Sequence, residues 1–156
     1  MFLFYIIILI LILEIIFGLY RQYNRITEYN KASQLSKKLN KPLLVIGDPN
    51  NGFMSKILSS YSCGDLCLDI VGCKGCKNQI EGDALQELKK MKDNSYIIFE
   101  SCVLEYIQYN KLVREEILRV SGNKYFEVRI GLSLINLGYY PGGLFTNEST
   151  KIYSVN

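Results

Sequence analysis

The stretch that most constrains the fold is LLVIGDPNNG, at residues 43–52. Its first part, residues 43–48, is an apolar run with the length of a buried strand. Residues 49–52 are rich in turn-forming side chains, and residues 53–61 then favour a helix. A strand, a tight turn and a helix in this order predict the first unit of an α/β fold.

The same order recurs further along the chain. Further strands are predicted at 65–70, 96–101 and 125–130, and helices at 84–91 and within 104–120. Alternating strands and helices imply right-handed crossovers and a mainly parallel sheet, with helices on both faces. After residue 131 we expect a turn at 140–143 and a final strand at 151–155, which would form a terminal hairpin.

Residues 1–20, MFLFYIIILILILEIIFGLY, differ in character from the rest of the chain. A helix needs about 20 apolar residues to cross a bilayer, and this run has that length. The basic start and small-residue cleavage site of a secretory signal peptide are both missing. The sequence therefore predicts an uncleaved transmembrane anchor, or signal anchor, over residues 1–20.

Glu14 is the one charged residue inside this predicted span. An ionised carboxylate at the centre of a membrane helix costs about 2.5–3.5 kcal/mol on insertion scales. We therefore expect Glu14 to snorkel toward the headgroups, to be protonated, or to pair with a polar group on another membrane helix.

Basic residues follow the span and none precedes it, which by the positive-inside rule places the remainder of the chain in the cytosol. The odd number of cysteines, five, fits a reducing compartment better than a fully paired disulfide framework. The expected protein is single-pass, with its C-terminal domain cytosolic.

Residues 21–40 place Ile26, Tyr29, Ala32 and Leu35 at helical spacing, which predicts an amphipathic stalk helix that ends at Asn40. Residues 41–156 are enough for one α/β domain. The net charge is only +3, and much of the excess is juxtamembrane, where it favours anionic lipid. No nucleic acid partner is indicated, because a clustered basic face on the domain is missing.

Acidic residues mark the ends of the predicted strands, where open α/β sheets bind ligands. The first strand ends at Asp48 and the second at Asp69, and Asp83 opens a later helix. A tight turn lets backbone approach a nucleoside, and a carboxylate after the next strand accepts its ribose hydroxyls. The alternative for each residue is a helix cap or a turn.

Four segments extend this pattern in a particular order: Gly82-Asp83-Ala84, then DNSYIIF at 93–99, VLEYI at 103–107 and VREEILRV at 113–120. With residues 43–69, this series resembles the class I S-adenosylmethionine-dependent methyltransferases. The resemblance covers most of residues 43–130. It implies a small Rossmann-like fold that binds S-adenosylmethionine.

The resemblance also implies roles for individual residues. Asp48 would be the acid of the glycine-rich loop and Gly52 a loop glycine, with Asn50 where the family prefers Gly. Asp69 would hold the ribose hydroxyls. The remaining residues would lie around the adenine or beneath the cofactor: Asp83, Ala84 and Cys102.

The chain departs from the family at two positions. Ile97 replaces an acid that is common on the fourth strand, and Tyr106 replaces a common His in a chain with no histidine. No catalytic base is assigned. The first hypothesis is a membrane-anchored methyltransferase-like protein with an unknown acceptor. The second is an inactive relative that serves as a structural or adaptor subunit of a membrane-associated assembly, such as a virion or organelle complex.

Cysteines cluster at 63, 67, 73 and 76. The pair Cys73 and Cys76 has the spacing of a metal knuckle and is the candidate for zinc. Cys63 and Cys67 are expected about 20 Å away along a strand, too far for one tetrahedral site. The alternatives are a disulfide or redox pair between Cys73 and Cys76, or, as the geometry favours, buried small side chains with an exposed thiol pair.

Overall fold

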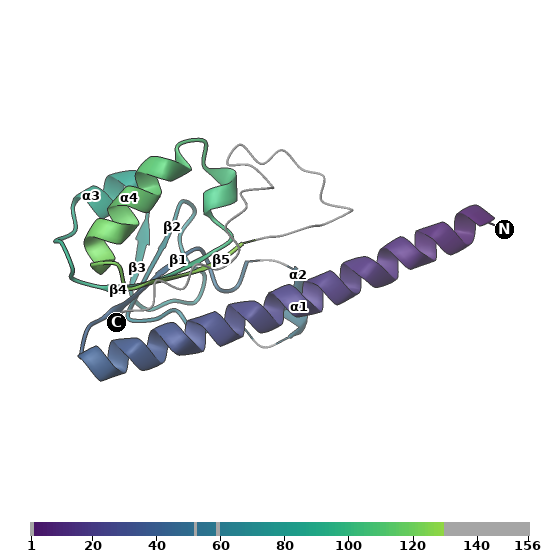
Figure 1. Cartoon of the computed structure of the whole chain (residues 1–156), viewed down its shortest axis with the longest axis horizontal. Helices are drawn as coiled ribbons and strands as arrows, with labels where there is room; N and C mark the ends of the chain where they lie inside the picture. Colours follow the sequence, from purple (N-terminus) through teal and green to yellow (C-terminus); the bar gives the residue numbers. More distant parts are fainter. Residues whose placement is uncertain (1, 52, 59, 130–156) are drawn as a thin grey trace.

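The structure is a computed structural model that describes residues 2–51, 53–58 and 60–129. A long N-terminal helix, α1 (Phe2–Leu39), lies beside a five-stranded parallel sheet of order β3-β2-β1-β4-β5 (Figure 1). The strands are β1 (Leu43–Ile46), β2 (Leu66–Asp69), β3 (Gln79–Glu81), β4 (Ile97–Ser101) and β5 (Tyr125–Val128). The other helices are α2 (Phe53–Ile57), α3 (Ala84–Lys89), a 3₁₀ turn η1 (Leu104–Tyr106) and α4 (Asn110–Ser121).

The predicted α/β fold with a parallel sheet is confirmed, and its strands at 43–48, 65–70, 96–101 and 125–130 correspond to β1, β2, β4 and β5. The sequence did not reveal β3. It has only three residues, at the sheet edge, and its central Ile80 is only partly buried. The predicted turn at 140–143 and strand at 151–155 lie outside the described residues.

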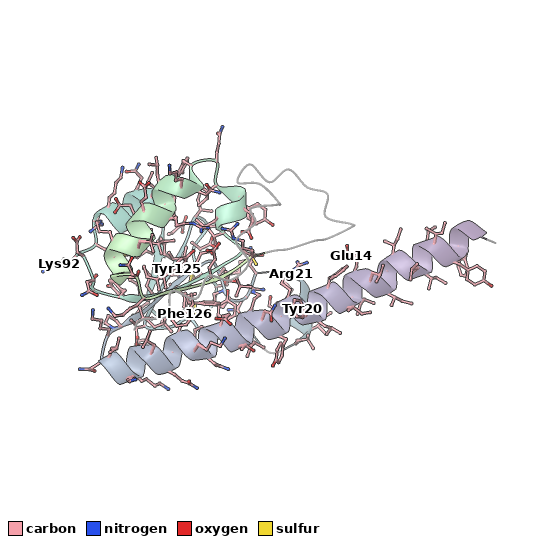
Figure 2. The ribbon with its side chains drawn as sticks, in the orientation of Figure 1. Glu14, Tyr20, Arg21, Lys92, Tyr125 and Phe126 are labelled. Atoms are coloured by element: carbon pink, nitrogen blue, oxygen red, sulfur yellow. A yellow bond between two sulfur atoms is a disulfide. The ribbon has the colours of Figure 1, made fainter. Side chains whose placement is uncertain are left out.

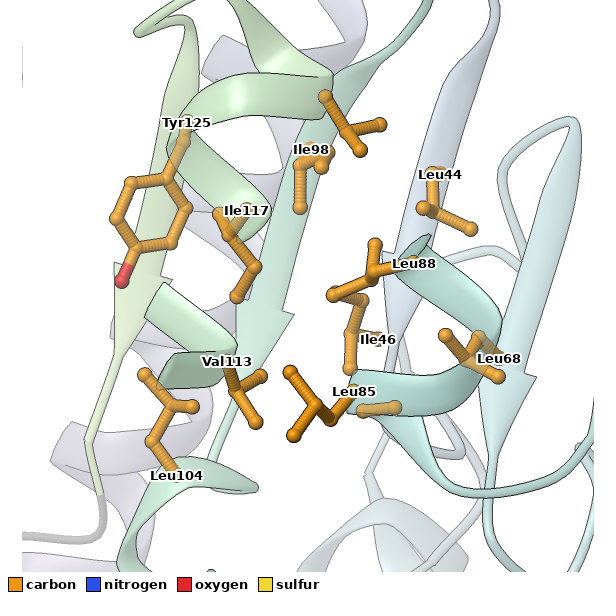
Figure 3. Packing of buried hydrophobic residues seen from close by; sticks show 12 residues of the cluster. Leu44, Ile46, Leu68, Leu85, Leu88, Ile98, Leu104, Val113, Ile117 and Tyr125 are labelled. Atoms are coloured by element: carbon orange, nitrogen blue, oxygen red, sulfur yellow. The ribbon is translucent and has the colours of Figure 1, made fainter. Parts of the chain in front are cut away.

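One face of the sheet packs against α3 and α4. Figure 3 shows Leu44, Ile46, Leu68 and Ile98 from the strands facing Leu85 and Leu88 of α3 and Val113 and Ile117 of α4. These side chains are all buried. β1 and β4 are buried along their whole length, as central strands of a covered parallel sheet should be.

The other face packs against the second half of α1 and the cysteine-rich loop. Tyr29 and Ala32 of α1 are buried against Val45, Phe99 and the cysteines. Residues 21–39, predicted as a stalk, are thus a layer of the domain. The helix ends where Asn40 takes the left-handed φ of 49°, and Ser36 Oγ donates to the Lys41 carbonyl in the turn that leads to β1.

The first half of α1 extends beyond the domain (Figure 1), and it is the one helix among the described residues that is long and apolar enough to cross a membrane. Its most apolar window has a mean hydropathy of 2.3 and is not buried by the rest of the protein. Figure 2 shows Glu14 further from the domain along α1 than Tyr20 and Arg21.

Candidate functional site

A cavity of about 910 Å³ lies at the carboxyl ends of the central strands. It is lined by Ile46 at the end of β1, Asp69 at the end of β2 and Ser101 at the end of β4. Strand order reverses between β1 and β4, because the chain builds outward to β3 and then returns to β4. Open α/β sheets bind ligands at this position, so the cavity is the candidate site.

Gly47 makes the close packing of strand ends at the cavity possible. It has φ +99°, a conformation that side chains disfavour, and its N–H donates to the Leu68 carbonyl over 2.9 Å. A Cβ at this position would lie 2.8 Å from Val103 Cγ2 and 2.9 Å from the Ser101 carbonyl oxygen. Only glycine fits between the ends of β1 and β4.

Asp48 and Asp69 both line the cavity, as predicted. The Asp48 N–H donates to Asp69 Oδ2 over 2.9 Å, and the Val71 N–H donates to Asp69 Oδ1 over 3.0 Å. Asp48 Oδ1 accepts the Asn50 N–H over 2.9 Å, which closes the turn. The Asp69 carboxylate therefore joins two loops, and each of its oxygens retains one lone pair for a ligand hydroxyl.

Asp83 and Ala84 also line the cavity. Asp83 is the N-cap of α3: its Oδ1 accepts the Gln86 N–H over 3.1 Å. Its Oδ2 accepts the Tyr109 hydroxyl. The helix-cap alternative is therefore present, and both carboxylate oxygens already have a donor.

Of the other predicted site residues, only Cys102 lines the cavity among those that the structure describes. Asn50 does not line the cavity: its Nδ2 donates to the Lys74 carbonyl, and its φ is not positive. Gly52 lies outside the described residues. Cys102 does line the cavity, with φ 57°. Burial, with a smaller effect of Glu105, raises the pKa of the Cys102 thiol to about 12, so it is protonated near neutral pH.

Two arginines that sequence reasoning did not assign to the site, Arg21 and Arg25, line it from α1. Arg25 Nε donates to Ser101 Oγ over 2.8 Å and its Nη2 to the Tyr61 hydroxyl over 3.0 Å, while the guanidinium carbon lies 5.0 Å from the Tyr61 ring centre. These contacts tie α1 to the end of β4. The basic residues after the span are the available signal, but in the sequence they indicate only membrane topology and attraction for anionic lipid.

A buried acid, Glu100, lies on β4 behind the cavity and is fully inaccessible to solvent. Its Oε1 accepts the N–H groups of Val103 and Leu104 over 2.5 and 3.2 Å. Among the described residues its Oε2 has no hydrogen-bond partner. Burial, followed by the charges of Glu105 and Glu127, raises the pKa of Glu100 well above its ordinary value of 4.5.

Glu100→Gln should make the protein more stable at neutral pH. Because the pKa of Glu100 is raised on folding, the folded state binds this proton more tightly, and its stabilisation is lost as pH rises from 4.5 through the folded pKa. Gln keeps the acceptor for Val103 and Leu104 and carries no charge. Thermal unfolding between acidic and neutral pH should show a flatter profile for Glu100→Gln than for the wild type. The exposed Glu115→Gln is the control, and identical profiles for both variants would contradict this assignment.

The favoured prediction for the cysteines, an exposed thiol pair at Cys73 and Cys76, was wrong, and so was the alternative of a disulfide between these two residues. Cys63 bonds to Cys76 and Cys67 to Cys73, with Cα–Cα distances of 5.6 and 6.2 Å, and only Cys102 is a free thiol. The missed strand β3 explains the error. It pairs in parallel with β2, with Cys67 opposite Gln79, so the loop must run back along β2 before β3 begins. This return brings Cys73 to Cys67 and Cys76 to Cys63.

The two pairs of cysteines lie close enough together to form one metal site, contrary to the distance of about 20 Å expected from the sequence. The sulfurs of Cys67, Cys73 and Cys76 lie within 4.8 Å of one another, and all three residues are buried. Reduced, these three and the adjoining Cys63 form a compact group of thiols, which is the donor set of structural zinc.

Comparisons with models of known families, with curated proteins and with solved structures found no match to this chain.

Proposed function

We propose that this protein is a membrane-anchored, methyltransferase-like protein of Rossmann-like fold that binds S-adenosylmethionine at the cavity. The observation that carries the proposal is the cavity's position between the ends of β1, β2 and β4, with Asp48, Asp69 and Asp83 around it. A volume of about 910 Å³ accommodates a nucleoside ligand with further space.

The chemistry suits a site without histidine. Methyl transfer is an in-line displacement that depends on aiming the acceptor at the methyl group and excluding water, more than on a strong base. In the proposal, Asp69 accepts the ribose hydroxyls through its free lone pairs, and Gly47 lets the backbone approach the ligand. The acceptor is not assigned, and no residue is proposed as a catalytic base.

The direct test is calorimetric titration of the full chain, in detergent or nanodiscs, with S-adenosylmethionine and with its demethylated product. We expect heat of binding and a rise in thermal stability with both compounds. The absence of both binding heat and a thermal shift at millimolar ligand would contradict the proposal.

Asp69→Asn should weaken this binding by more than about tenfold, because hydrogen bonds to a charged acceptor are worth about 1.5–3 kcal/mol each. The matched control is Glu81→Gln, at the exposed end of the neighbouring strand and paired in register with Asp69. Titration and thermal unfolding should be measured on both variants. Equal losses of affinity in both variants, or a folding defect in Asp69→Asn alone, would contradict the assignment of Asp69 to the ribose hydroxyls.

The second candidate function is that of an inactive structural or adaptor subunit of a membrane-associated assembly. The observation that favours it is that Asp69 and Asp83 already bind the protein's own backbone and Tyr109. Phe99 is buried beneath α1 and does not line the cavity. A folded full chain that binds neither nucleoside would support this second function.

The side of the membrane on which the domain lies has two opposing indications. Basic residues after the span favour the cytosol. Two disulfides favour an oxidising compartment. Arg25 and Lys41 have structural roles, at Ser101 and at Asn94, which weakens the charge argument. The cytosolic placement therefore stays a prediction, and a count of free thiols in the cell-derived protein tests it.

Glu14 is proposed to snorkel toward the headgroups, to be protonated, or to pair with a polar group of another membrane helix, because an ionised acid in a membrane is costly and commonly functional. Glu14→Leu should leave membrane insertion intact, and where a partner helix exists it should also reduce self-association or co-purification of that partner. Crosslinking in membranes measures this, with Ile12→Leu as the neutral control. Unchanged association would leave snorkelling or protonation as the role of Glu14.

A further inference from the structure

The cavity faces the same way as the membrane segment. β1 runs back along α1, because only residues 40–42 separate the end of the helix from the start of the strand. Since all five strands are parallel, their carboxyl ends lie toward the apolar half of α1. Arg21, which directly follows the predicted span, lines the cavity itself. The cavity is therefore at the membrane-proximal end of the domain. Figure 2 shows Arg21 where α1 begins to extend beyond the domain.

Apolar and aromatic side chains surround this end of the cavity and are exposed. Ile70 and Val71, after β2, are 69% and 68% exposed, and Tyr106 and Tyr109, after β4, are 54% and 41% exposed. All four line the cavity. Exposed aliphatic residues with tyrosines, grouped next to a membrane helix, are typical of a surface that sits in the bilayer interface.

Arg21 and Arg25 line the cavity from α1, and three carboxylates, those of Asp48, Asp69 and Asp83, line it as well. These carboxylates accept loop N–H groups or the Tyr109 hydroxyl. Among the described residues, Arg21 and Arg25 form no ion pair, and the three side-chain hydrogen bonds of Arg25 all go to neutral acceptors: Ser101, Tyr61 and Gln22. The Nε of Arg21 is buried, with no hydrogen-bond partner among the described residues. Guanidinium groups bind phosphate through paired N–H donors, so the arrangement fits an anionic phosphate ester.

We propose that the cavity binds the phosphate headgroup of an anionic membrane lipid through Arg21 and Arg25, with Ile70, Val71, Tyr106 and Tyr109 inserted into the membrane interface. Bound from the bilayer, the lipid keeps its acyl chains in the membrane and raises only its headgroup to the arginines. The inference goes beyond nucleoside binding and does not depend on it.

The test uses the full chain in nanodiscs and in detergent. Native mass spectrometry should show at least tenfold more retained phosphatidylglycerol than phosphatidylcholine when the two are supplied equally. Arg21→Gln should abolish this preference. Lys38→Gln removes the same charge from the same helix about 26 Å away, at an exposed position, and should leave the preference unchanged.

Three results would overturn the proposal: equal retention of both lipids by the wild type, an unchanged preference in Arg21→Gln, or an equal loss in Lys38→Gln. A soluble competitor identifies the source of the phosphate. If glycerol 3-phosphate displaces the lipid at equal concentration, the site binds a soluble phosphate ester and the lipid assignment fails. Because both ligands are assigned to the same cavity, the nucleoside titration is run in detergent without added phosphatidylglycerol and is read separately, so failure of either ligand leaves the other result standing.

Discussion

A chain that begins at residue 41 is expected to remain unfolded, whereas a chain that begins at residue 21 should fold and leave the membrane. The reason is the double role of α1. Its first half has exposed apolar side chains, and its second half covers a face of the sheet. Removing residues 1–20 deletes the segment that holds the protein in the bilayer, and removing twenty more deletes part of the core.

Several contacts would be lost together in the shorter chain. The Tyr29 ring packs against Phe99 and Tyr61, with ring centres 5.6 and 5.4 Å apart, and Ala32 is completely buried. Arg25 would no longer bind Ser101. Truncating one large buried side chain costs about 3–5 kcal/mol, and a whole domain is stable by only about 5–15 kcal/mol. Loss of the layer therefore exceeds the available stability.

Circular dichroism and thermal unfolding measure the folding of the two truncated chains, and ultracentrifugation after high-salt washing measures their membrane association. The full chain should sediment with membranes despite salt, because burial of apolar residues is not screened. The chain 21–156 should be soluble, with a cooperative transition. Cooperative unfolding of 41–156 would show that α1 is dispensable, and salt release of the full chain would contradict a spanning helix.

The fold was predictable where the local pattern matches the final environment. β1 and β4 are continuous apolar runs because both faces of the central strands are covered, and α4 has the spacing of one buried stripe. The second half of α1 was predicted as a helix for the same reason. Its partner was not, because helical spacing shows that a face is buried without showing against what.

The strand β3 shows the opposite case. An edge strand of three partly exposed residues has no pattern of its own, since its pairing with β2 supplies its structure. Without β3, the sequence pattern places Cys73 and Cys76 at the far end of β2 from Cys63. The disulfide pairs therefore could not be predicted from it. One missing strand thus changed the predicted chemistry of four residues.

The site was predictable in position more than in detail. Asp48, Asp69, Asp83, Ala84 and Cys102 do line one cavity, because the carboxyl ends of parallel strands meet at one edge. The hydrogen bonds of Asp83 to Gln86 and Tyr109 depend on loops whose shape no strand pattern encodes. Arg21 and Arg25 reach the site from a helix far away in sequence, so only the packing of α1 on the sheet reveals them.

Cysteine labelling of the chain, alkylated on lysis and then denatured without reductant, should detect one thiol of the five, which is Cys102, and this result would contradict the cytosolic placement that the basic residues predict. After reduction, all five should label. Cys102→Ser should lower the first count to none while leaving both disulfides intact. Five thiols without reductant would place the domain in a reducing compartment, and one bound zinc per chain would then identify Cys63, Cys67, Cys73 and Cys76 as its ligands.

The same disulfides should account for a large part of the domain's stability. Removing a native disulfide from a small domain typically costs about 2–5 kcal/mol, chiefly because the unfolded chain gains freedom. Cys63–Cys76 closes a sequence separation of 13 residues and Cys67–Cys73 one of 6, so the first should contribute more in a chain-entropy account. Paired substitutions, Cys63→Ala with Cys76→Ala and Cys67→Ala with Cys73→Ala, separate the two contributions in urea unfolding of the full chain.

Both pairs also pack beneath α1 in the same cluster as Tyr29 and Phe99, so their loss should loosen that face of the sheet first. Hydrogen exchange should therefore increase at Val45 and Phe99 more than at Leu88 and Ile117 on the opposite face, and a uniform increase would show that the disulfides act only through the unfolded state.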